Sequence, residues 1–219
     1  MNFKQFEIDD VMKEHYRSAR WTIAWLCLLL PFLSILFGFI GVLQGYIPNP
    51  NWWHSISDTY YANSKAIMIG ILSITTFYFA TYKGYDIRDR IVNCLSALFA
   101  AGVALFPNKG VDGLIQLSYS TGNLIHCICA VALYATFLFN CFWLFRLGGS
   151  NTKEKKIRNR FYFGSGIGIV IATIFIFGCG SLGLSKYIPN YVWIGETIAQ
   201  ISYAIAWFVK SGRFIIDKK

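Results

Sequence analysis

The chain of 219 residues is 55% hydrophobic and 18% aromatic, and only 14% of its residues are charged. Soluble domains average about 25% charged residues, so this composition predicts an integral membrane protein without a separate soluble domain. The net charge of +9 would favour nucleic acid only on the basic face of a soluble fold, so we expect no nucleic-acid partner. Lys and Arg lie in short segments between apolar runs, where membrane lipids are the expected partners.

The chain begins with residues 1–20, which mix charged and apolar residues. This pattern predicts a short amphipathic, interfacial N-terminal helix rather than a cleaved signal peptide. Residues 21–209 hold six apolar segments, each close to the ~20 residues that a helix needs to cross a bilayer. The predicted spans are residues 21–44, 66–82, 91–107, 124–145, 161–184 and 192–209. The sequence therefore predicts an all-α membrane protein, a single six-transmembrane helix bundle with a polar cytoplasmic tail at 210–219.

Lys and Arg are distributed unevenly between the two sides of this predicted bundle. The N-terminal segment, the turn at 83–90, the connection at 146–160 and the C-terminal tail hold 17 of the 20. The other three loops hold one each, Lys65, Lys109 and Lys186. By the positive-inside rule, both termini are cytoplasmic, the protein is integral to the plasma (inner) membrane, and the first loop faces outward.

The densest polar and aromatic stretch is Trp52–Tyr61, in the first outer loop. Polar side chains beside a membrane-embedded segment are costly unless they are paired, hydrated or functional. Spans four and six each carry a pair of polar residues near their outer ends, spaced three and four apart, so each pair shares a helical face. We predict that loop and helices form one outward-facing ligand pocket from His54, Ser55, Ser57, Asp58, Tyr60, Tyr61, Asn123, His126, Glu196 and Gln200.

Four interpretations of this pocket are open. Its polar groups could form a hydrogen-bonded network that fastens the loop over the bundle, because unsatisfied polar groups in hydrocarbon are costly. The pocket could also bind the headgroup of an outer-leaflet lipid or another amphiphile. No cofactor is the simpler expectation, but a divalent metal such as zinc, held by His54, Asp58, His126 and Glu196, could activate water for hydrolysis. Finally, Asp58 with a serine of the same loop and a histidine could form a nucleophilic set, although no nucleophile elbow is present.

Three small residues, Gly164, Gly168 and Ala172, follow one another at steps of four in span five. Small residues on one helical face let a neighbouring helix approach closely, which would suit a homo-oligomer. An oligomeric channel or a membrane-disrupting effector is therefore one alternative function. The sequence favours a regulatory, non-catalytic protein that binds or senses a lipid or other amphiphile.

Ile56-Ser57-Asp58, placed just before span two, resembles the Ile-Ser-Asp signature of the FRAG/DRAM/SFK-like six-span membrane proteins and their uncharacterised bacterial relatives. The likeness in topology covers roughly residues 20 to 210 and implies a lipid-linked or regulatory role without one defined reaction. The Ser, Asp and His inventory is also similar to that of intramembrane hydrolases of the alkaline ceramidase and adiponectin-receptor type. Those enzymes use three histidines, whereas His54 and His126 are the two available here. This likeness implies a metal-dependent, ceramidase-like lipid hydrolase as the other alternative.

Overall fold

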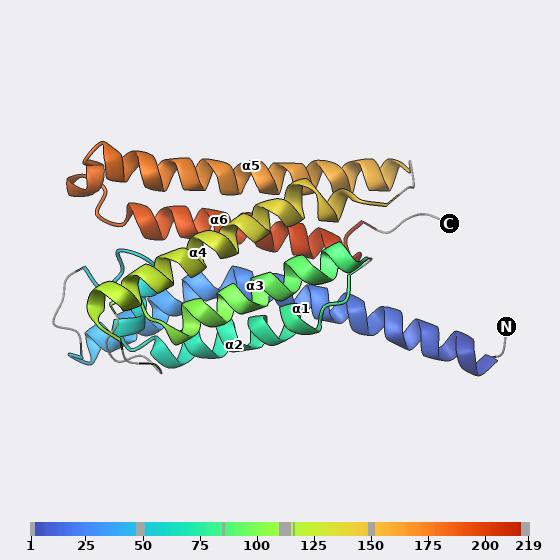
Figure 1. Cartoon of the computed structure of the whole chain (residues 1–219), viewed down its shortest axis with the longest axis horizontal. Coiled ribbons are helices and arrows are strands. Elements are labelled where there is room, and N and C mark those ends of the chain that lie inside the picture. The colour runs from blue at the N-terminus through green and yellow to red at the C-terminus, as the bar shows by residue number, and fades with distance from the viewer. Residues whose placement is uncertain are drawn as a thin grey trace.

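The computed structural model describes residues 3–46, 51–84, 86–109, 115, 117–148 and 152–215, with side chains from residue 11 onward. Over these ranges the chain forms helices and no strand. The α-helices are α1 (Phe3–Leu43), α2 (Lys65–Thr81), α3 (Ile87–Leu105), α4 (Tyr119–Phe142), α5 (Lys153–Ser181) and α6 (Tyr191–Lys210). Short 3-10 helices are η1 (Ser57–Tyr61), η2 (Leu144–Arg146) and η3 (Leu184–Lys186). Figure 1 shows the α-helices side by side in alternating directions. Both termini lie at the same end of the bundle, and α1 extends beyond the other helices there.

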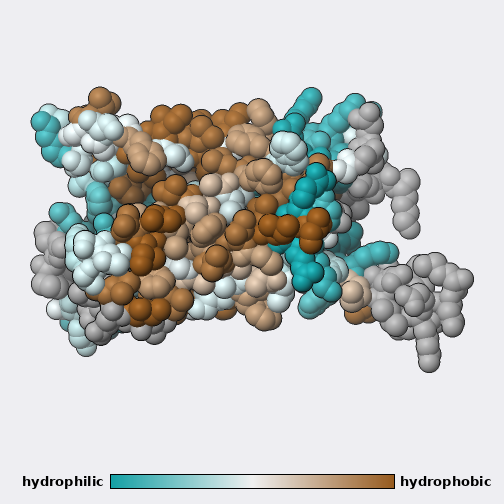
Figure 2. Space-filling model, in the orientation of Figure 1, coloured by the Kyte–Doolittle hydropathy of each residue, from teal (hydrophilic) through white to brown (hydrophobic). Residues whose placement is uncertain are grey.

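Within the part of the chain that the structure describes, four helices are long and apolar enough to cross a membrane, namely Val11–Leu43, Tyr119–Arg146, Lys153–Ser181 and Tyr191–Lys210. The helix α2 is apolar but has only 17 residues, and α3 carries Arg88, Asp89 and Arg90 in its first turn. Figure 2 shows, on the face in view, a broad apolar band across the middle of the molecule and hydrophilic residues toward both ends. This distribution is consistent with a membrane protein, because only the ends of a spanning bundle meet water and headgroups.

Two helices begin well before the apolar runs that predicted them. Ser118 and Thr152 each accept a hydrogen bond from the backbone N–H three residues further on, at 3.4 and 3.2 Å. Such caps satisfy backbone donors at a helix start, so polar residues upstream of an apolar run become helical. As a result, α4 begins at Tyr119 rather than residue 124, and α5 begins at Lys153 rather than residue 161.

Residues 3–20 of the predicted interfacial helix continue directly into the first predicted span, so that both belong to one helix, α1, of 41 residues. No Gly or Pro occurs near Trp21 to interrupt it, and at about 1.5 Å per residue α1 is about 60 Å long. The described part of the predicted tail contacts α1. Arg213 donates to Glu14 and Ser18 of α1 at 2.8 and 3.0 Å. The last four residues of that tail, and residues 1 and 2, lie outside the described residues.

The small residues of α5 are used mostly within the chain. Gly168 lies against Ser202 of α6, so that a Cβ at Gly168 would collide with the serine. Ala172 is fully buried, and its carbonyl oxygen approaches Gly195 of α6. Gly164 is the member of the set that stays exposed. The face predicted for a second copy of the chain therefore mainly packs α5 against α6.

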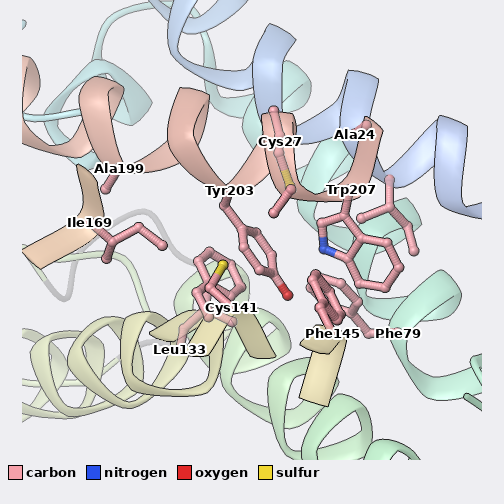
Figure 3. Close-up of a cluster of buried hydrophobic side chains, with 14 of the residues drawn as sticks. Ala24, Cys27, Phe79, Leu133, Cys141, Phe145, Ile169, Ala199, Tyr203 and Trp207 are labelled. Atoms are coloured by element: carbon pink, nitrogen blue, oxygen red, sulfur yellow. The ribbon is translucent and has the colours of Figure 1, made fainter. Parts of the chain in front are cut away.

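The centre of the bundle is aromatic, with Tyr203 and Trp207 projecting from α6 toward neighbouring helices (Figure 3). The Tyr203 ring stacks on Phe137 of α4 at a centroid distance of 3.7 Å, and Trp207 meets Phe145 edge-on at 4.9 Å. The Nδ2 of Asn140 donates to the Tyr203 hydroxyl at 2.8 Å, which joins α4 to α6. We call this cluster the aromatic core and define it as Phe79, Phe137, Phe145, Tyr203 and Trp207.

Candidate functional site

The loop between α1 and α2 folds into η1 through its own short polar side chains. The Ser55 hydroxyl donates to Oδ2 of Asp58 and accepts from the Asp58 N–H, each at 2.9 Å. The Thr59 hydroxyl donates to the Ile56 carbonyl at 2.6 Å. Ser, Thr and Asp side chains commonly stabilise such turns by bonding to nearby backbone groups. The loop therefore closes on itself and presents Ser57 at the first position of η1.

Asp58 also ties this loop to the segment that follows α3. Its Oδ1 accepts from Nδ2 of Asn108 at 3.0 Å and lies 3.5 Å from Nζ of Lys109. The Lys109 N–H donates to the Tyr61 hydroxyl at 2.8 Å, and the Lys109 ammonium lies over the Tyr61 ring. Because Ser55, Asn108 and Lys109 all engage the Asp58 carboxylate, this residue fastens two loops together.

The other side of the loop is fastened to α6 and the turn before it. The Ile56 N–H donates to Oε2 of Glu196 at 2.6 Å, and the Trp193 N–H donates to the His54 carbonyl at 2.9 Å. The His54 ring donates through Nδ1 to the Pro189 carbonyl at 2.5 Å. Glu196, an acidic residue within an apolar helix, thus meets a backbone donor, as a polar group in hydrocarbon requires.

His126 is buried on α4, and both of its ring nitrogens are engaged. Nδ1 lies 2.8 Å from the Phe106 carbonyl. A carbonyl can only accept, so Nδ1 carries the proton and Nε2 of the neutral ring is an acceptor. The Ser57 hydroxyl lies 2.8 Å from Nε2 and therefore donates to it. Ser57, His126 and the Phe106 carbonyl form a directed chain of hydrogen bonds.

A pocket of about 430 Å³ lies beside these groups. Its polar floor, as we call it, contains Asn108 and seven of the ten predicted residues, His54, Ser55, Ser57, Asp58, Asn123, His126 and Glu196. Its apolar wall includes Val131, Tyr134, Leu138, Ile176, Phe177 and Val192. Val131 and Phe177 are 61% and 63% exposed on the outside of the bundle. The pocket therefore opens sideways onto the apolar surface band.

Three predicted residues lie outside this pocket. Tyr60 is buried against Met68 of α2, and Tyr61 bonds to the segment after α3, because successive side chains of a helical turn point in different directions. Gln200 lies one turn deeper than Glu196 and lines a separate void of about 40 Å³. These three residues support the pocket from behind and do not line it.

Several residues that line the pocket were not predicted from the sequence. Ala130, Tyr134 and Leu138 follow His126 at steps of four, a spacing that places them on the same face of α4 and could have identified them. Asn108 lies in a short loop, where no helical spacing marks the residues that face the pocket. The α5 residues of the wall carry no signal either, because their place depends on how α5 packs against α4.

The four predicted metal ligands do not converge into a metal-binding group. Within the described ranges, no three His, Cys, Asp or Glu side chains come together as a metal would require. Both ring nitrogens of His126 bond to protein groups, and Asp58 and Glu196 each hold part of the loop. The zinc hypothesis therefore gains no support from the geometry.

Known proteins offer no guide to this pocket. Comparison of the chain with family models, curated proteins and solved structures finds no match. The resemblance of Ile56-Ser57-Asp58 to the FRAG/DRAM/SFK-like proteins stays a prediction. Function has to be inferred from the geometry and chemistry of the pocket itself.

Proposed function

We propose that the chain is a six-span membrane protein that binds a lipid or another amphiphile in this pocket, in a sensing or regulatory role. The observation that carries the proposal is the two-sided lining, a polar floor at the loop end and an apolar wall that opens on the surface band. An amphiphile has the same division of polarity. Its headgroup can bond to the polar floor while its acyl chain stays in apolar surroundings. Binding therefore does not require the acyl chain to enter water.

The alternating helix directions support six spans with both termini cytoplasmic. Three connections lie at the pocket end, and of the 20 Lys and Arg residues they hold Lys109 and Lys186, while Lys65 follows the first connection as the first residue of α2. The charged first turn of α3 lies at the opposite end, which is rich in Lys and Arg. By the positive-inside rule, the pocket faces outward.

Cysteine labelling tests this arrangement. Ser118 and Thr152 are both exposed helix caps at opposite ends of the bundle, so Ser118→Cys and Thr152→Cys are matched substitutions. In a background without the native cysteines, a membrane-impermeant maleimide added to intact cells should label the first variant and not the second. Labelling of both, or of the second alone, would contradict the proposed topology.

Blocking the pocket tests the binding itself. Ala130 lines the pocket, whereas Ala80 is exposed on α2, so Ala130→Phe and Ala80→Phe add the same side chain inside and outside the site. We expect Ala130→Phe to weaken binding of a fluorescent phospholipid by about tenfold or more, since about 1.4 kcal/mol suffices for that change. Ala80→Phe should bind as the unaltered protein does. Equal binding by both variants would exclude this pocket as the lipid site.

A further inference from the structure

Ser57 differs from its hydroxyl-bearing neighbours in its partner. The Ser55 hydroxyl bonds within the loop, and the Thr59 hydroxyl bonds to Ile56 and to Met68 at the start of α2. The Ser57 hydroxyl instead bonds to the buried imidazole of His126, 69 residues along the chain. The distance of 2.8 Å is within the reach that proton transfer between a nucleophile and its base needs. Ser57 is half-buried, and both residues line the pocket, so a bound molecule can contact the pair.

The third member of the arrangement is a backbone carbonyl. The Phe106 oxygen accepts from Nδ1 of His126 at 2.8 Å and so leaves Nε2 to accept the Ser57 proton. A carboxylate has this orienting role in the familiar serine triads. Asp58 does not take it here, although it is next to Ser57, because its carboxylate bonds to Ser55, Asn108 and Lys109.

We propose that Ser57 and His126 are the nucleophile and the general base of an acyl-transfer site that cleaves the ester of an amphiphile. The proposal rests on amphiphile binding in the pocket, as proposed above. The Ser57 Oγ forms a bond to the acyl carbon while its proton moves to Nε2 of His126. The ester C–O bond then breaks, and Nε2 returns the proton to the departing alcohol. Water attacks the acyl-serine with His126 again as base, which releases the carboxylic acid and restores Ser57.

The surroundings suit an ester at the boundary between headgroup and acyl chain. The apolar wall can accommodate the acyl chain of the ester. The polar floor borders solvent at Lys109, whose side chain is 35% exposed, so water has access to the ester. Asn123 lines the pocket one turn from His126 on α4, and its amide oxygen accepts from the Cys127 thiol. Its Nδ2 can donate to the carbonyl oxygen as negative charge develops there. The substrate class is a long-chain carboxylic ester of a lipid.

A serine-directed probe tests the proposal on the full-length protein in detergent. An alkyl fluorophosphonate with a fluorescent tail should form a bond to the Ser57 oxygen with loss of fluoride, and peptide mass spectrometry should locate the adduct at Ser57. Ser57→Ala should abolish labelling. His126→Gln, which keeps a polar side chain without a base, should slow labelling by about 10²–10⁴-fold. Ser73→Ala, an exposed serine of α2, serves as the matched control and should label normally.

Two parallel measurements separate failure of this proposal from failure of lipid binding. Each preparation is assayed for binding of the fluorescent phospholipid and for hydrolysis of p-nitrophenyl butyrate and palmitate. We expect the palmitate to be cleaved faster, since its chain can follow the apolar wall. Unaltered protein that binds the phospholipid, leaves Ser57 unmodified and cleaves neither ester would overturn acyl transfer and leave the binding function standing. Protein that neither binds nor reacts would overturn both. Labelling of the unaltered protein decides the question even if the variants fold poorly.

Discussion

The polar floor and the aromatic core both include residues of α4 and α6, and they differ in what lies between these two helices. Toward the loop end, His126 and Glu196 bond to the loop and leave a pocket of about 430 Å³. Two or three turns further along, Tyr203 and Trp207 fill the space completely. From this difference we infer that the aromatic core holds the helices in place. Substitutions in the polar floor should therefore destabilise the fold less than substitutions in the aromatic core.

The sharpest test of this division is Trp207→Ala in the aromatic core. Trp207 is 0% exposed, so its loss leaves a large cavity, and we expect destabilisation by about 3–5 kcal/mol. Thermal unfolding in detergent measures the effect. Trp143→Ala is the matched control, because Trp143 is 55% exposed and should matter little. Equal melting temperatures for the two variants would contradict the inference that the aromatic core holds the helices in place.

A smaller effect is expected from the polar contact inside the core. Tyr203→Phe removes the hydroxyl that accepts from Asn140, leaving a buried amide donor without its partner. We expect a loss of about 1–3 kcal/mol in the free energy of unfolding. Adding Asn140→Leu removes the donor as well, so the double variant should be more stable than the sum of the two single changes predicts. Strict additivity in chemical unfolding would argue against the contact.

On the polar floor, substitutions of Glu196 distinguish a role in stability from a role in ligand binding. Glu196→Gln keeps an oxygen for the Ile56 N–H, so we expect a loss of stability of about 1 kcal/mol or less, whereas Glu196→Leu should cost about 1–3 kcal/mol. Phospholipid binding provides the second measurement. If the carboxylate contacts a cationic headgroup, the Gln variant should bind as poorly as the Leu variant while remaining folded. Unchanged stability and binding in both variants would place Glu196 outside the site.

The smallest effect is expected at Asp86, on the surface and away from both regions. The Asp89 N–H, and then the Arg88 guanidinium at 2.8 Å, hold the pKa of Asp86 below its ordinary value. A lowered pKa in the folded state contributes stability at neutral pH that is lost as the pH falls through it. The unaltered protein should therefore melt slightly above Asp86→Asn at neutral pH, and the difference should shrink below about pH 4. A difference that grows on acidification would contradict this assignment.

Much of the pocket could be predicted from local pattern, that is, from the density of polar residues in the first outer loop and from spacing within single helices. His126 and Asn123 share a face of α4 because they are three residues apart, and seven of the ten predicted residues line one pocket. The role of each residue could not be predicted in this way. Both Ser55 and Ser57 were candidates for the nucleophile, and only the geometry of η1 shows that Ser57 reaches the imidazole while Ser55 bonds to Asp58.

The sequence by itself determined the features that depend on local pattern. Apolar runs determined where the helices lie, and the Lys and Arg count distinguished the two ends, because hydropathy and charge act residue by residue. The tertiary structure decided which helix faces meet. It packed Gly168 and Ala172 against α6, brought α5 to the pocket wall and set Phe106 beside His126. A helix that is apolar all round carries no periodicity to mark its inner face, so these contacts follow from the fit of side chains distant in sequence.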